Sequence, residues 1–76
     1  MLLSAKVEEA KAEDIIKKLY LYYMENTDLL PEEYLNLVWI SGQSWERAVS
    51  DYVSGMTDAY AIHTFEEIFV PKSWQY

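Results

Sequence analysis

The chain has 76 residues with 13 acidic and 6 basic side chains, a formal net charge of −7 at pH 7, one histidine and no cysteine. These counts limit it to one domain, exclude disulfides and cysteine-based zinc sites, and argue against binding to a nucleic-acid backbone, which needs a basic face. No apolar run approaches the roughly 18 to 20 residues that cross a bilayer, and the first residues are too poor in apolar side chains for a secretory signal, so we expect a cytoplasmic protein that does not enter a membrane.

The first predicted element is a helix over residues 5–26, with Ser4 as its N-cap because good helix formers follow that side chain. Apolar side chains recur at three- and four-residue spacings and form one stripe along it. The stripe comprises Ala12, Ile15, Ile16, Leu19, Tyr22 and Tyr23. Asp14 and Lys18 stand four residues apart with the acid first, which is the order that stabilises a helix.

A polar break at residues 26–28 separates this element from a second helix, expected over residues 31–41. Pro31 suits the first helical position, because its missing N–H would be unpaired there in any case. Two glutamates follow it in the first turn, where acidic side chains favour the helix dipole.

The most regular stripe predicts a third helix over residues 44–55, with Ser44 as its N-cap. Its apolar side chains are Trp45, Ala48, Val49, Tyr52, Val53 and Met56. Gly55 is expected to end this helix in a tight break, and Thr57 is expected to cap a fourth helix over residues 57–69. The apolar stripe of the fourth helix comprises Ala61, Ile62, Phe65, Ile68 and Phe69.

The helical period runs through the whole chain, so we predict an all-α fold. It is a single helical domain of residues 1–76, a small bundle of three to four helices at about 5–26, 31–41, 44–55 and 57–69. Three Trp, seven Tyr and two Phe are many for so short a chain, since a small domain buries only about 60% of its unfolded surface. We therefore expect self-association through the side chains that are hardest to bury, namely Tyr20, Leu21, Met24, Trp39 and the tail Trp74, Gln75 and Tyr76.

The chain offers no self-sufficient active site. His63 is the only histidine, and a helix-surface histidine is a simpler interpretation than a weak metal site with Glu66 and Glu67, three and four residues later. Neighbouring carboxylates such as these do not face each other on a helix, so they do not form an acid–base pair. We expect no catalytic residue, no metal ligand and no cofactor in this chain.

Arg47 and Asp51 are the polar residues with two open interpretations. They stand four apart on the third predicted helix, and Asp58 lies beyond Gly55 in the first turn of the fourth. One interpretation is a set of local ion pairs and caps. The other is a polar network that holds Arg47 against another part of a larger protein, because arginine makes bidentate contacts with carboxylate or phosphate.

The segment from Asp51 to Ala61, Asp-Tyr-Val-Ser-Gly-Met-Thr-Asp-Ala-Tyr-Ala, resembles a signature near the C-terminus of the deoxyguanosine triphosphate triphosphohydrolases, which are HD-domain metal-dependent phosphohydrolases. The family pattern reads Asp-Tyr-Ile-Ala-Gly-Met-Thr-Asp, a variable residue, then Tyr-Ala, with an arginine upstream. Ala59 stands at the variable position, where the family often has a polar residue or arginine. The resemblance points to eight residues: Arg47, Asp51, Tyr52, Gly55, Met56, Thr57, Asp58 and Tyr60. We expect them to be mainly structural, with contact to substrate, effector or an interface as the alternative.

The resemblance implies a chemistry that this chain does not perform by itself. In the family, His and Asp ligands of the HD motif bind a divalent metal such as Mg or Mn, which activates water to release a deoxynucleoside and triphosphate. Those ligands are not in this chain. The resemblance therefore implies the C-terminal helical domain of a dNTP triphosphohydrolase-like protein, packed on the catalytic HD domain, forming oligomer contacts, or both. The alternative is a free-standing acidic helical protein–protein interaction module.

Overall fold

The computed structural model describes the backbone of residues 2–70 and the side chains of residues 11–70. The elements in this range are all helical, which confirms the predicted all-α fold with four α-helices. They are α1 (Leu2–Glu25), the short 3-10 helix η1 (Thr27–Leu29), α2 (Glu32–Trp39), α3 (Trp45–Ser54) and α4 (Asp58–Phe69). No helix within residues 2–70 is long and apolar enough to cross a membrane. The predicted aromatic tail at Trp74, Gln75 and Tyr76 lies outside the described residues.

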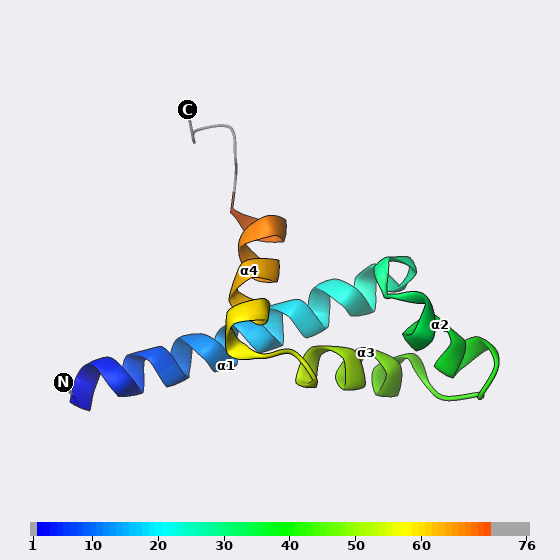
Figure 1. Ribbon diagram of the computed structural model, residues 1–76, viewed down its shortest axis with the longest axis horizontal. Coiled ribbons are helices and arrows are strands. Elements are labelled where there is room, and N and C mark those ends of the chain that lie inside the picture. The colour runs from blue at the N-terminus through cyan, green and yellow to red at the C-terminus, as the bar shows by residue number, and fades with distance from the viewer. Residues whose placement is uncertain (1, 71–76) are drawn as a thin grey trace.

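The helices form an open layer around α1. In Figure 1, α3 runs back alongside α1, α2 packs against α3 at the turn end, and α4 crosses α1 and projects away from the other helices. The molecule measures 46 × 34 × 17 Å with a radius of gyration of 14.4 Å, against roughly 11 Å for a compact chain of this length. It exposes 5897 Å², where a compact monomer of this mass exposes about 4,900 Å².

The core lies mainly between α1 and α3. The buried side chains are all apolar: Leu19, Tyr23, Leu30, Ala48, Val49, Val53 and Ala61. The predicted stripe of the third helix is confirmed, because all of its side chains are buried or pack against this core. In α4 the predicted stripe is partly wrong, since Ile62 and Phe69 are 44% and 42% exposed. That helix contacts mainly α1, so only one narrow side of it is covered.

Two predicted caps are confirmed by hydrogen bonds. The Ser44 hydroxyl accepts from the backbone N–H of Arg47 at 3.1 Å, and the Thr57 hydroxyl accepts from the backbone N–H of Tyr60 at 3.1 Å. Each bond satisfies one of the N–H groups that the first turn of a helix leaves without an internal partner. The starts of α3 and α4 are therefore fixed by local chemistry.

Two other predicted helix starts are wrong. Ser4 is not an N-cap, because α1 already begins at Leu2 and leucine is a good helix former. Pro31 is not the first helical residue, because its ψ of 152° is extended, and it is the N-cap of a helix that begins at Glu32. Its carbonyl accepts from the N–H groups of Tyr34 and Leu35, at 2.9 and 3.1 Å.

The two glycines adopt different backbone conformations. Gly55 ends α3 as predicted, but with φ −82° and ψ −5°, a conformation that any residue can adopt. The left-handed backbone occurs at Gly42, with φ 75°, in the turn between α2 and α3. This turn begins earlier than predicted, because α2 ends at Trp39 instead of residue 41. Glycine is suited to Gly42 because it has no Cβ to clash at positive φ.

Candidate functional site

The signature residues gather at a hollow between α2 and the turn that joins α3 to α4. This hollow, of about 460 Å³, is called the tyrosine hollow below. It is lined by Pro31, Glu33, Tyr34, Tyr52, Gly55, Met56, Thr57 and Tyr60. Five of these belong to the signature, whereas Arg47, Asp51 and Asp58 do not line it. The structure therefore divides the eight candidate residues between a shared hollow and other surfaces.

The side of the hollow formed by α2 was not predicted from the sequence. Pro31, Glu33 and Tyr34 lie far before the signature in the chain, and they reach it because α2 packs on α3. The rings of Tyr34 and Tyr52 lie 5.1 Å apart between centroids, at 57°. The signal that could have pointed to Tyr34 is its place on a helix that is apolar over most of its surface, which indicates neighbours on more than one side.

The surroundings of the Tyr52 hydroxyl favour its neutral form. Burial raises its pKa above the ordinary value of 10.0, and hydrogen bonds with Tyr60 and Tyr23 act in the same direction. Burial also raises the pKa of Tyr23, and the hydrogen bond with Tyr52 opposes part of that rise. At neutral pH these hydroxyls are uncharged groups that can donate and accept hydrogen bonds.

Arg47 and Asp51 form a local ion pair on the surface of α3. Arg47 Nε donates to Asp51 Oδ2 at 3.3 Å, and the two side chains are 66% and 44% exposed. An exposed pair of this kind stabilises a protein by about 0.2–1 kcal/mol. Within the described residues, this geometry agrees with the interpretation of Arg47 and Asp51 as a local ion pair.

Asp58 serves the start of α4, in whose first turn it lies behind the Thr57 cap. It lines a different hollow, of about 540 Å³, between α1 and α4 together with Lys11, Ile15 and Ile62 among others. An acidic side chain in the first turn interacts favourably with the helix dipole. Its place in the structure is therefore accounted for by the helix that it begins.

The described residues do not fit a divalent-metal centre. Among residues 11–70, no group of three or more His, Asp or Glu side chains is placed to hold a metal ion. His63 and Glu66 are exposed on α4. A metal that activates water needs several ligands fixed around it, so no catalytic step is assigned to this part of the chain.

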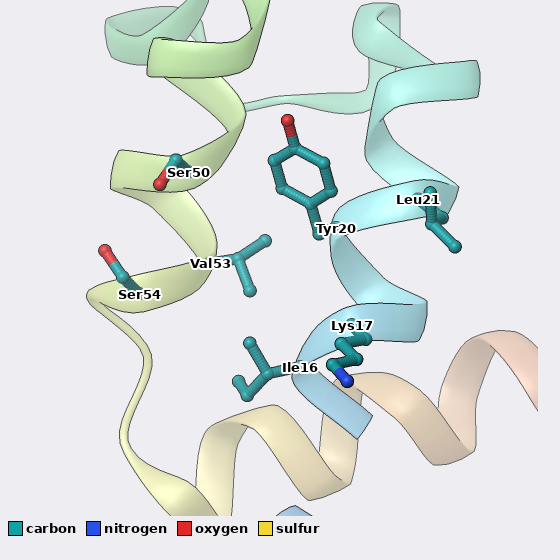
Figure 2. Close-up of a pocket in the computed structure, with 7 residues that line it drawn as sticks. All are labelled: Ile16, Lys17, Tyr20, Leu21, Ser50, Val53 and Ser54. Atoms are coloured by element: carbon teal, nitrogen blue, oxygen red, sulfur yellow. The ribbon is translucent and has the colours of Figure 1, made fainter. Parts of the chain in front are cut away.

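A second feature is an apolar groove between α1 and α3, of about 360 Å³. It is lined by Ile16, Lys17, Tyr20, Leu21, Ser50, Val53 and Ser54. Figure 2 shows Ile16 and Tyr20 of α1 facing Val53 of α3, with the two serines along the α3 side. Leu21 is 61% exposed beside the groove. The sequence pointed to Tyr20 and Leu21 as hard to bury, which is wrong for Tyr20, since it packs against the core, and it did not point to the groove itself.

Comparisons with known proteins agree on one family. Residues 3–67 match the model of the phosphohydrolase-associated domain. A deoxyguanosinetriphosphate triphosphohydrolase-like protein of Caldanaerobacter subterraneus is 44% identical over 70 residues, which are 92% of this chain and 20% of that protein. Proteins of the same description from Clostridium tetani and Geobacter metallireducens are each 39% identical, over 88% and 80% of this chain and 19% and 15% of their own lengths. The chain thus spans between 15% and 20% of the length of these curated relatives. No solved structure shows a significant match.

Proposed function

The chain belongs to the phosphohydrolase-associated domain family, and from this membership we propose that it is the C-terminal helical domain of a cytoplasmic dNTP triphosphohydrolase-like protein. The observation that carries the proposal is the match to triphosphohydrolase-like relatives over nine tenths of this chain but only a fifth of theirs. The remaining four fifths of such a protein would supply the HD-motif ligands, a bound Mg or Mn ion, and the hydrolysis of a deoxynucleoside triphosphate such as dGTP.

The role proposed for this domain is to pack on the catalytic part, to form contacts between copies, or both. The support is its open shape and its uncovered apolar surface. The groove between α1 and α3 is almost wholly apolar, and Trp39 and Ile40 at the end of α2 are 66% and 77% exposed. Contiguous exposed apolar patches mark interaction surfaces in proteins.

A chimera tests the proposal. In the Caldanaerobacter subterraneus relative, the segment that matches this chain is replaced by this chain. Folding is followed by thermal denaturation, and triphosphate release from dGTP is followed with Mg or Mn. We expect the chimera to fold and to act within several-fold of the unmodified relative, whereas deletion of the segment abolishes both. A matched chimera carrying Val53→Asp, which places a charge in the core, should behave like the deletion. A chimera with the native chain that also behaves like the deletion would overturn the proposal.

The chain alone provides a second test. Purified and supplied with dGTP and Mg or Mn, it should release no triphosphate. Metal-dependent turnover by the chain alone would contradict its assignment as a domain without metal ligands. Tight binding to an unrelated basic protein, with a chimera that fails to fold, would favour a free-standing acidic interaction module instead.

A further inference from the structure

The tyrosine hollow brings aromatic rings from three helices to one place. Tyr34 comes from α2, Tyr52 from α3 and Tyr60 from α4, and Met56 lines the hollow with them. Tyr60 is 51% exposed, so part of this aromatic surface is open to a partner. Ring faces carry negative potential and attract cations.

The charge around the hollow is negative, as is the electrostatic potential of the ring faces. Glu33 contributes a carboxylate, and none of the residues that line the hollow is basic. Arg47, the one arginine in the sequence, is paired with Asp51 at 3.3 Å. With a net charge of −7 over the whole chain, the hollow favours a cation and disfavours a phosphate group.

The chain already uses an aromatic ring in this way elsewhere. Lys18 Nζ lies 5.8 Å from the centroid of the Phe65 ring, and it also pairs with Asp14 at 3.1 Å. A cation held between a ring and a carboxylate is therefore a contact that this fold makes within itself. The tyrosine hollow presents the same two kinds of group, a carboxylate and several rings, with no cation of the chain among its lining residues.

We propose that the tyrosine hollow receives an arginine side chain from the rest of the phosphohydrolase that carries this domain. A guanidinium group is planar, so it stacks on a tyrosine ring, and its N–H groups can donate to the Glu33 carboxylate and to tyrosine hydroxyls. Lysine has a compact, strongly hydrated charge and stacks less well. The source of the arginine rests on the proposed function, but recognition of the guanidinium group by the hollow does not.

The experiment uses the chain and a small probe. N-acetyl-arginine N-methylamide is titrated into the protein, followed by NMR of the Met56 methyl group and the tyrosine ring protons. The matched control is N-acetyl-citrulline N-methylamide, which has nearly the same shape without the charge. We expect saturable shifts confined to residues that line the hollow with arginine, and much smaller shifts with citrulline. Equal shifts with both probes, arginine shifts spread evenly over all acidic surfaces, or no shifts at all would each overturn the proposal.

Two variants localise the binding. Tyr60→Ala removes an exposed ring and should weaken arginine binding roughly two- to five-fold, the range for an exposed cation–π contact. Glu33→Gln should weaken it by a similar factor. Glu46→Gln is the matched control, because Glu46 occupies the first turn of α3 as Glu33 occupies that of α2, but does not line the hollow. If Glu46→Gln weakens binding as much as Glu33→Gln, the attraction is general and the hollow is not the site. Because the probe needs no catalytic domain, a failed chimera and a failed titration are distinguishable results.

Discussion

The rings of Tyr23 and Tyr52 meet edge to face, with 5.2 Å between their centroids and 88° between their planes, and this contact joins α1 to α3. It belongs to a line of neighbouring aromatic rings that passes through all four helices. In order, the line comprises Tyr34, Tyr52, Tyr23, Tyr22, Phe69 and Phe65, with 4.8 to 5.7 Å between successive centroids. Half of the aromatic side chains in the sequence thus link the helices to one another. Aromatic pairs of this geometry add about 0.5–1.5 kcal/mol each beyond their buried area.

The centre of the core should be sensitive to truncation. Leu19 is fully buried on α1, so Leu19→Ala is expected to lower the free energy of unfolding by about 2–5 kcal/mol, because it removes buried methyl groups and leaves a cavity. Leu21→Ala is the matched control two residues away, where the side chain is 61% exposed, and it should cost less than about 1 kcal/mol. Urea denaturation followed by circular dichroism measures both. Equal losses for the two variants would contradict the assigned core.

The start of α4 should depend on one hydroxyl. Thr57→Ala removes the acceptor for the Tyr60 N–H and is expected to destabilise the chain by about 1 kcal/mol, whereas Thr57→Ser keeps the acceptor and should cost much less. The free energy of unfolding in urea provides the measurement. A Thr57→Ser variant as unstable as Thr57→Ala would show that the hydroxyl is not what matters.

The local pair on α3 should matter little in the isolated chain. Arg47 and Asp51 are exposed, so Arg47→Ala is expected to change the free energy of unfolding by less than about 1 kcal/mol, with a smaller effect at high salt. The same substitution in the chimera tests whether Arg47 meets the rest of a phosphohydrolase. A loss of several kcal/mol in the isolated chain would mean that the local interpretation is wrong.

Stability should fall at alkaline pH. Tyr52 has a raised pKa in the folded state, so above the ordinary tyrosine pKa of about 10 the unfolded chain loses its proton first. The contribution of Tyr52 to the free energy of unfolding is then constant below that pH and decreases as the pH rises above it. Tyr52→Phe should make the decrease shallower, although Tyr23 still contributes in the same direction. Urea denaturation at a series of pH values from 8 to about 11 measures this, and a stability that rises over that range would contradict the raised pKa.

The end of α2 is expected to mediate self-association of the isolated chain. Trp39 and Ile40 are 66% and 77% exposed, and the Trp39 ring meets Trp45 edge to face at 6.4 Å. The double variant Trp39→Gln, Ile40→Lys should shift the chain toward monomer in sedimentation velocity, because it replaces an uncovered apolar patch. Leu29→Gln, at another exposed apolar position, serves as the control. A clean monomer of the unmodified chain at high micromolar concentration would argue against association.

The parts of the fold that the sequence predicted are the ones set by local chemistry. The caps at Ser44 and Thr57 and the stripe of α3 depend on residues within a few positions of one another, and the structure confirms them. The starts at Ser4 and Pro31 were misplaced because several positions near a helix end can satisfy the same local preferences. The first helix begins three residues earlier than predicted and the second begins one residue later.

The sequence identified only the part of the tyrosine hollow that the signature residues form, and the reason differs from that for the misplaced helix starts. The resemblance singled out Tyr52, Met56 and Tyr60 as signature residues, and all three line the hollow. Glu33 and Tyr34 join them through the packing of α2 on α3, which no local pattern specifies. The exposure of Ile62 and Phe69 has the same origin, since it depends on which helices α4 does not touch.

The few contacts of α4 bear on which part of the fold unfolds first. This helix packs mainly on α1 and is joined to α3 by a short turn that contains Gly55 and Thr57. We therefore expect it to separate from α1 while the pairing of α1 with α3 stays intact, a local opening that breaks only part of the core. Backbone amides of α4 should accordingly exchange with solvent deuterium sooner than those around Val49 and Val53. The pair formed by α1 and α3 would then be the stable part of the molecule, and α4 the part that opens.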